Sequence, residues 1–358
     1  MEWKEDVLGN VLEVKYGKDH KKLADGQYPV YGSGGLMRYV DSKLYDGPSI
    51  LIPRKGTLNN IMFVESPFWT VDTMFWSIIN TDKVDPKFLF YSICKRDFAS
   101  MNVGSAVPSM TVNILNDIQI SYPKNIEDQR RIASILSSLD RKIELNNKIN
   151  ADLEEMAQAI FKNWFVDFEP FKDGKFVDSE LGMIPEGWKV GCLGDIAEIT
   201  SGKRPPKKSK DKTKELFIPL IGASDIMGFT SDVLYERPIL VIGRVGTHGV
   251  VQRFQEKCWP SDNTLVIESS YYNYVYQLLK GIDYSAINRG STQPLITQTD
   301  VKNTDVIIAP ENVLKEYESI TSTLFSKHRA NIKENSRLSL LRDTLLPRLM
   351  SGELEVPE

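Results

Sequence analysis

The chain has 358 residues, of which 41% are hydrophobic, so it is long enough to bury more than one domain core. Its 44 Lys and Arg against 48 Asp and Glu give a net charge of -4, which argues against binding to nucleic acid through overall charge. No stretch approaches the roughly 18 consecutive apolar residues of a membrane helix, and the start MEWKED does not resemble a secretory signal. We therefore expect a cytoplasmic protein whose phosphate contacts, if any, come from local basic patches.

Metal and cofactor chemistry has few candidate ligands in this sequence. Three cysteines, Cys94, Cys192 and Cys258, lie far apart without a CxxC pair, and the chain has only three histidines to complement them. A structural zinc site needs closely spaced ligand pairs, which are missing. We expect no metal site, no cofactor and no catalytic residues.

The N-terminal segment recurs once along the chain. WKEDVLGNVLEVKYGK, which begins at Trp3, returns at Trp188 as WKVGCLGDIAEITSGK, a shift of 185 positions. A repeat of this kind indicates two copies of one structural unit. The identical positions of the first copy are Trp3, Lys4, Leu8, Gly9, Glu13, Gly17 and Lys18.

A second pair of segments extends the repeat. SILIPRKGT (Ser49 to Thr57) is similar to PILVIGRVGT (Pro238 to Thr247), and an insertion raises the shift to 190. At this shift Arg54, Gly56, Thr57, Trp69 and Asp72 match Arg244, Gly246, Thr247, Trp259 and Asp262. Aliphatic runs that end at a glycine predict a buried strand and a turn, and further strands are expected at 73–79 and 264–267. Each half is thus predicted to be a mixed α/β globule.

Each globule is followed by a heptad pattern. After Glu127, apolar residues and two asparagines recur at steps of three and four, and the same positions recur after the second globule. We predict two long antiparallel helices, each about 50 Å long for roughly 35 residues, in which buried asparagines fix the register. A helical hairpin within one compact core is the alternative. The helix-pairing residues are Leu139, Ile143, Asn146, Asn150, Leu153, Leu324, Asn331, Asn335 and Leu338.

Three segments carry a resemblance to a known family. They are EDQRRIASILSSLDRKIELNNKINADLEEMAQAIFKNWFVDF (Glu127 to Phe168), LGMIPEGWKVGCLGDIAEITSGKRP (Leu181 to Pro205) and LRDTLLPRLMSGEL (Leu341 to Leu354). Over nearly its full length the chain resembles the specificity subunits of type I restriction-modification systems. The resemblance implies two target recognition domains, held apart by the helices, that each read one half of an interrupted site in double-stranded DNA. It also implies two modification (methyltransferase) subunits bound along the helices, together with restriction/translocase subunits.

The expected fold is therefore α/β, more closely α+β, with a pseudo-twofold internal repeat. We predict a first recognition domain at 1–125, a central coiled-coil helix at 126–168, a linker at 169–187, a second recognition domain at 188–310 and a C-terminal coiled-coil helix at 311–352. The protein would recognise DNA and perform no catalysis itself. Half-sites read on one face of the duplex lie about 34 Å apart, which predicts an interrupted target.

Candidate DNA contacts lie on predicted turns that carry basic or hydroxyl side chains beside glycines. Such turns let the main chain approach phosphates, and an arginine there forks onto guanine or phosphate. The alternatives are an arginine paired with a carboxylate such as Asp72 or Asp262, and solvated loops. The candidates are Lys15, Lys18, Lys21, Lys22, Ser33, Arg54, Lys55, Thr57, Lys203, Arg204, Lys207, Lys208, Arg244, Thr247, Arg289, Ser291 and Gln293. Most aromatics, including Trp69 and Trp259, are expected in the core rather than stacked on bases.

Three other functions are weighed against DNA recognition. An adenine methyltransferase needs a DPPY- or NPPY-like tetrapeptide, which is missing. Glu13 and Lys15, with Asp6 nearby, have nuclease-like spacing, but the second half has Thr200 in place of the lysine. A coiled-coil scaffold that binds only proteins leaves the basic loops unexplained, and DNA binding with strong salt dependence would separate it from a DNA reader.

Overall fold

The computed structural model describes residues 1–102, 108–247, 249–290 and 294–356. The chain forms two compact units, one made of Met1–Asn147 with Ile332–Glu358 and the other of Lys148–Asn331. Each unit contains one globule and one half of each of two long helices, α3 (Ile126–Phe165) and α6 (Glu311–Met350). The long helices therefore belong to both units rather than to a helical hairpin in one core.

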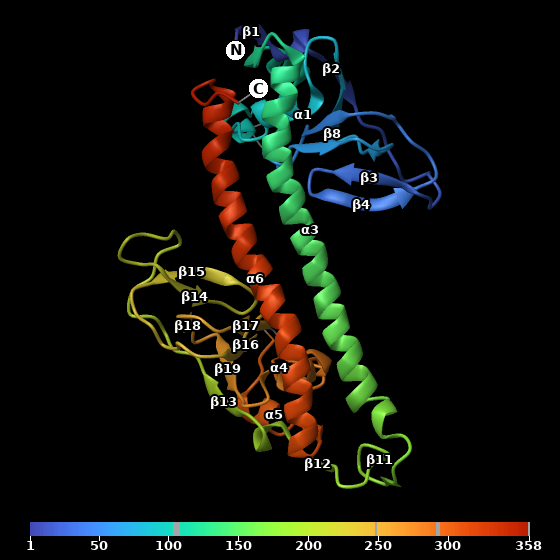
Figure 1. Cartoon of the computed structure of the whole chain (residues 1–358), viewed down its shortest axis with the longest axis vertical. Coiled ribbons are helices and arrows are strands. Elements are labelled where there is room, and N and C mark those ends of the chain that lie inside the picture. The colour runs from blue at the N-terminus through green and yellow to red at the C-terminus, as the bar shows by residue number, and fades with distance from the viewer. Residues whose placement is uncertain (103–107, 248, 291–293, 357–358) are drawn as a thin grey trace. The chain divides into compact units, whose positions relative to one another are not determined.

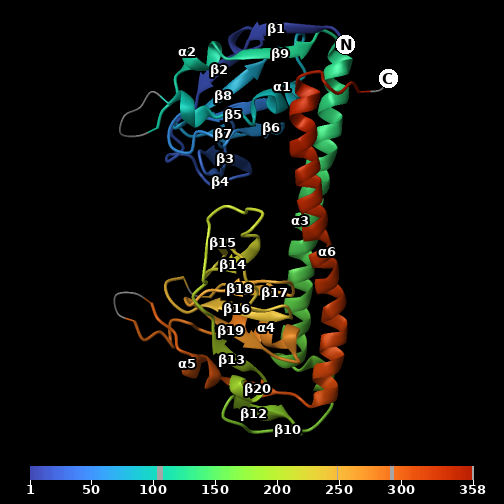
Figure 2. The same cartoon turned by 90° about the vertical axis from the view of Figure 1, so that its left-hand side faces the viewer.

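The globule of the first unit contains three small sheets, visible in Figures 1 and 2. The first pairs β1 (Trp3–Val7) with β9 (Gln119–Pro123). The second has the order β2 (Leu12–Tyr16), β8 (Met74–Ile79), β5 (Ser49–Pro53), β6 (Met62–Val64). The third has the order β4 (Gly35–Val40), β3 (Tyr28–Gly32), β7 (Trp69–Thr70), of which β3 and β7 run parallel.

Short helices complete this globule. They are η1 (Leu8–Asn10), α1 (Pro86–Ile93), η2 (Phe98–Met101) and α2 (Val112–Asn116). Helix α1 starts where its sequence favours a helix, since Pro86 fits the first turn and the Asp85 side chain accepts a hydrogen bond from the main-chain N–H of Phe88 at 2.9 Å. Every residue of β5 is buried, because the strand lies inside the sheet, its central residues Ile50 to Ile52 are aliphatic, and the Ser49 hydroxyl donates to the main-chain oxygen of Ser77 at 2.8 Å.

The globule of the second unit repeats the first strand for strand. Its sheets are β12 (Lys189–Cys192) with β20 (Asp305–Ile308); β13 (Glu198–Ser201), β19 (Thr264–Glu268), β16 (Ile239–Gly243), β17 (Val251–Phe254); and β15 (Ile226–Thr230), β14 (Ile218–Ile221), β18 (Trp259–Pro260). Its helices are η4 (Leu193–Asp195), α4 (Tyr272–Gly281) and α5 (Gln298–Lys302). Between α3 and this globule lie η3 (Glu169–Phe171) and the pair β10 (Phe176–Val177) and β11 (Ile184–Pro185). The predicted internal repeat and the α+β class are confirmed.

The long helices pair antiparallel within each unit. In the first unit Asn146 donates hydrogen bonds to Asn335 and to Glu334, both at 2.8 Å. In the second unit Asn331 donates to Asn150 at 2.9 Å. A higher residue number on α3 thus pairs with a lower residue number on α6, which shows that the helices run in opposite directions. The predicted asparagine positions face one another.

Apolar side chains of the helix pair extend the core of each globule. In the first unit Leu136 and Leu349 are buried in the same cluster as the globule residues Phe88 and Leu115. In the second unit Tyr317 packs with Phe165 and Tyr274. Each globule is thus joined to its part of the helix pair by a continuous apolar core.

Candidate nucleic-acid interface

The first globule presents a basic turn directly after β5. The main-chain N–H of Arg54 donates to Thr73 at 2.8 Å, and its carbonyl accepts from Met110 at 2.9 Å. Gly56 has a positive φ of 89°, which a glycine adopts without strain, and its N–H donates to Pro108 at 3.2 Å. The turn is therefore held on both sides, which fixes the direction in which its side chains leave the sheet.

The second globule builds the same turn. Arg244 donates from its main-chain N–H to Asn263 at 2.8 Å and accepts from Ile296 at 2.9 Å. Gly246 has a φ of 84° and donates to Pro294 at 3.1 Å. The sequence match at this turn therefore extends to its hydrogen bonds.

A basic loop follows β2 in the first globule, and a tryptophan holds its start. Lys18 donates from its main-chain N–H to Thr70 at 2.8 Å, and its carbonyl accepts from the indole N–H of Trp69 at 2.9 Å. Gly17 is required here, because a Cβ at that position would overlap the carbonyl oxygen of Val71. The loop thus leaves the sheet from a fixed point beside the basic turn.

The basic loop after β13 is held in the same way. Lys203 donates from its main-chain N–H to Pro260 at 3.0 Å and accepts from the indole N–H of Trp259 at 2.7 Å. A Cβ on Gly202 would overlap the carbonyl oxygen of Ser261. The repeated Gly-Lys pair and the repeated tryptophan are thus two parts of one anchoring contact.

Sequence reasoning missed this role for the tryptophans. Trp69 and Trp259 are half-buried, and each uses its indole N–H to hold a loop, whereas Phe75, Trp76 and Tyr274 are core residues as predicted. The signal was present in the sequence, because Trp69 and Trp259 recur together with the Gly-Lys pairs. It became interpretable only when the structure showed that these segments touch.

Most predicted contact residues are exposed on these turns and loops. Within the described ranges none of those on the two basic loops forms an ion pair, so their charges face solvent. Ser33 lies against the basic turn, since a Cβ on Gly56 would stand 3.1 Å from its hydroxyl oxygen. The exposed predicted residues are Lys18, Lys21, Lys22, Lys55, Thr57, Lys203, Arg204, Lys207, Lys208 and Thr247.

Other predicted contact residues are engaged within the protein. Lys15 was assigned to a loop, which is wrong: it lies in β2, because the strand continues to Tyr16, and it pairs with Glu13. The side chain of Arg289 donates to Asp300 at 2.9 Å. Although its burial opposes ionisation, hydrogen bonds from Arg289 and Thr297 lower the pKa of the Asp300 carboxyl.

The arginines of the two basic turns, Arg54 and Arg244, are also among the predicted contact residues. The guanidinium of Arg54 lies 5.3 Å from the ring centroid of Tyr16 and donates to the main-chain oxygen of Asp72 at 3.3 Å. Arg244 is half-buried. The predicted residues Ser291 and Gln293 lie outside the described residues.

Asp6, part of the nuclease-like pattern, is also engaged. Its carboxylate accepts hydrogen bonds from Asn10 at 2.6 Å and from Tyr122 at 3.0 Å, and it pairs with Lys4. The hydrogen bonds from Asn10 and Lys4 lower its pKa below the usual range. These contacts account for Asp6 as a structural residue that ties β1 to β9.

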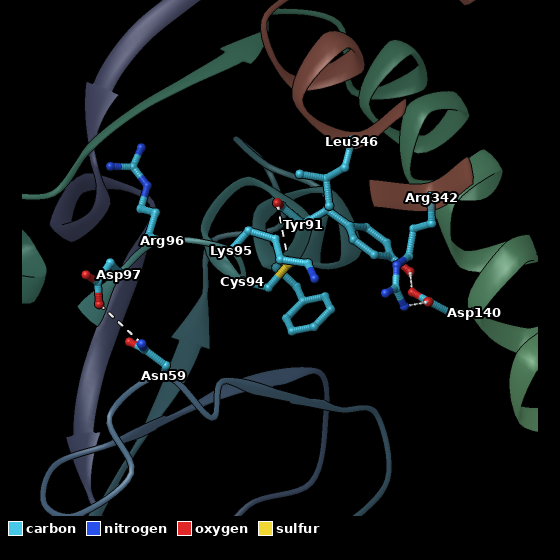
Figure 3. Close-up of a pocket in the computed structure, with 10 residues that line it drawn as sticks. Asn59, Tyr91, Cys94, Lys95, Arg96, Asp97, Asp140, Arg342 and Leu346 are labelled. Carbon is cyan, nitrogen blue, oxygen red and sulfur yellow. Dashed lines mark hydrogen bonds and ion pairs between the residues drawn. The ribbon is translucent and has the colours of Figure 1, made fainter. Parts of the chain in front are cut away.

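A pocket of about 410 Å³ lies in the first unit, where α1 meets the helix pair (Figure 3). Tyr91 donates to Asp140 at 2.6 Å, and Arg342 donates to the same carboxylate at 2.6 Å. Lys95 pairs with Asp343 at 3.2 Å, and burial raises the pKa of the Cys94 thiol to about 11. Arg96 donates to the main-chain oxygen of Gln119, and Asp97 accepts from Asn59 at 3.2 Å. Since the charged groups that line it are engaged by other protein groups, this pocket is a structural junction rather than a candidate ligand site.

Among the residues that the structure describes, no group of three or more His, Cys, Asp and Glu side chains is arranged to hold a metal ion. Within the same ranges no helix combines the length and the apolar character of a membrane span.

Comparison with known proteins assigns the chain to a family. The family model described as type I restriction modification DNA specificity domain matches residues 1–155 and 185–337, once for each repeat. The MjaIX specificity subunit of Methanocaldococcus jannaschii is 31% identical, over 94% of this chain and 86% of the relative. The HindI specificity subunit of Haemophilus influenzae is 24% identical, over 82% and 83%.

A solved structure agrees at the level of the fold. The type I restriction-modification S subunit from M. genitalium superposes with a TM-score of 0.68 over 98% of this chain and 96% of that one, at 16% identity. Two globules of one design, each matched by the model of a DNA specificity domain, place the chain in a class of proteins whose role is recognition. The chain belongs to the type I restriction-modification DNA specificity family, and it is therefore a specificity component rather than a catalytic one.

Proposed function

We propose that the chain reads an interrupted target in double-stranded DNA, with one half-site for each globule. The observation that carries this proposal is the repetition of one arrangement, in which a tryptophan-anchored basic loop lies beside a basic turn in both globules. In the proposed assignment the recognition domains are 1–125 and 188–310, and the long helices with a linker at 169–187 join them.

The exposed cations on the loops would position the duplex. Lys18, Lys21 and Lys203 carry charges that face solvent, and such groups bind phosphates without regard to sequence. Side chains of the turns, Arg54 and Arg244 above all, would contact base edges or the nearest phosphates. Local patches of this kind permit DNA binding by a chain whose net charge is -4.

The proposed partners are two modification subunits along the helix pair and restriction/translocase subunits beyond them. Large apolar side chains on α3 and α6 support a docking role, because Leu145 is 50% exposed, Ile332 50% and Leu340 70% in the chain alone. Partners and DNA of this kind would place the protein in the cytoplasm.

Methylation mapped base by base tests the proposal. Host DNA is compared with and without the gene for this chain, with the modification subunit present in both. We expect an interrupted motif that depends on the gene. A continuous motif would contradict the model of two readers, and a purified chain that shows no salt-dependent binding to duplex DNA would favour a protein-only scaffold.

A further inference from the structure

Each globule contains a small polar pocket at the same place in its fold. The pocket of the first globule, about 320 Å³, lies between the basic loop, Met37 of β4 and the turn at Asp72. That of the second globule, about 310 Å³, lies between the basic loop, Met227 of β15 and the turn at Asp262. Since Met227 and Asp262 both follow their counterparts by 190 positions, the pockets belong to the repeated design.

Both pockets present a carboxylate without a partner. Asp72 and Asp262 are exposed, and neither side chain forms a hydrogen bond or ion pair within the described residues. The nearest cation in the first globule, Arg54, donates to the main-chain oxygen of Asp72 and lies over Tyr16 instead. A strong hydrogen-bond acceptor therefore remains available beside the basic loops.

Each pocket also contains a buried polar atom with no partner. Ser261 is only 2% exposed, and although its main-chain N–H donates to Ile221 at 3.0 Å, its hydroxyl oxygen has no hydrogen bond. In the first pocket the Nδ1 atom of His20 is likewise buried and has no hydrogen-bond partner. Both atoms are enclosed by the protein, so the exposed carboxylates of Asp72 and Asp262, rather than these atoms, are the groups open to a bound molecule.

We propose that each pocket receives the major-groove edge of a G·C pair, with the carboxylate of Asp72 or Asp262 accepting a hydrogen bond from the N4 amino group of the cytosine. The inference rests on the proposed function and names the chemistry by which each half-site is read. A carboxylate only accepts hydrogen bonds, and cytosine offers a donor alone in the major groove. Adenine presents the acceptor N7 beside its amino group. N7 would face the acceptor oxygens of the carboxylate, so adenine is disfavoured.

The surroundings of the carboxylates fit a base edge next to the DNA backbone. The cavities lie at the lower end of the volumes known for ligand sites, about 300 to 1,000 Å³, so they suit a small polar group. Lys21 on one rim, and Arg204 with Lys207 on the other, are available to an adjoining phosphate. The rims differ in sequence, which lets the two globules select different neighbouring bases.

The test uses the full chain in complex with its modification subunit. Asp72→Asn and Asp262→Asn are compared with the unaltered complex by mapping methylation over all sites. Each variant should lose discrimination at one G·C position by about tenfold to a hundredfold, Asp72→Asn in one half-site and Asp262→Asn in the other. Binding to unrelated duplex DNA should rise, because a negative charge beside the phosphates is removed.

Two further variants separate base reading from general effects. Asp82→Asn removes an exposed carboxylate of the first globule that has no side-chain partner within the described residues, and it should leave the motif unchanged. Asp72→Glu keeps the charge but moves the carboxylate, so it should relax the same position without raising affinity for unrelated DNA. It also covers the case in which Asp72→Asn does not fold.

Unchanged motifs in both asparagine variants would overturn the inference and leave the proposed function standing. A change confined to A·T positions would overturn it as well. If the unaltered complex methylates a continuous motif, the proposed function fails first and this inference fails with it.

Discussion

The hydroxyl of Tyr91 on α1 donates a hydrogen bond to the carboxylate of Asp140 on α3 at 2.6 Å. Tyr276 on α4 donates in the same way to Glu154 of α3, at 3.1 Å. In each unit a tyrosine of the globule therefore joins that globule to the helix pair.

Replacing Tyr91 with Phe should destabilise the first unit. The phenylalanine keeps the ring but leaves the partly buried carboxylate of Asp140 with one donor fewer, and a hydrogen bond to a charged group contributes about 1.5 to 3 kcal/mol. Urea unfolding measures the change. Tyr39→Phe, at an exposed ring in β4, is the control and should shift the free energy of unfolding by less than about 0.5 kcal/mol. Equal effects of the two variants would contradict a role for the Tyr91 hydroxyl.

The asparagine pair of the second unit predicts a non-additive response. Asn331→Leu leaves the Asn150 side chain without its donor, which should cost about 1 to 3 kcal/mol. Adding Asn150→Leu replaces both amides by apolar groups and should restore most of the loss, because a leucine pair suits a coiled-coil core. Chemical unfolding of both single variants and the double variant gives the coupling free energy between Asn150 and Asn331. Additive losses would show that the amides act independently.

Trp69→Phe should impair one half-site. The variant keeps an aromatic side chain but loses the indole donor that holds the carbonyl of Lys18, so the basic loop gains freedom and binds DNA at a higher entropic cost. We expect the DNA affinity of the complex to fall about tenfold, because the lost free energy should be about that of one ordinary hydrogen bond. Trp259→Phe is the matched variant of the other globule. Competition with DNA altered in one half-site measures which reader is affected, and loss of the same half-site in both variants would contradict the assignment.

The sequence predicted elements better than partners. The repeat at Trp3 and Trp188 predicted two globules of one design, and the heptads predicted Asn146 and Asn331 as positions facing the opposite helix, because both patterns are local or periodic. The stacking of Arg54 on Tyr16 and the pairing of Arg289 with Asp300 were not predictable. Such contacts depend on which loops the sheets bring together, and this leaves no periodic pattern in a single sequence.

A histidine in the second unit makes stability depend on pH. Burial lowers the pKa of His328, Glu154 at 4.0 Å opposes this and Arg253 reinforces it. In the unfolded chain the pKa returns to about 6.5, so the unfolded state takes up the proton first as the pH falls. The contribution of this neutral histidine is therefore complete above the unfolded pKa and is lost as the pH falls through it towards the lower folded value.

His328→Gln removes that titration and should flatten the response. Thermal unfolding of both proteins at about pH 7.5 and about pH 5.5 measures it, and the unaltered chain should lose more stability on acidification than the variant does. Glu318, whose pKa is raised by burial, acts in the opposite direction but is common to both proteins, so its effect cancels in the comparison. Identical acid responses would mean that His328 takes up its proton equally readily in the folded and unfolded states.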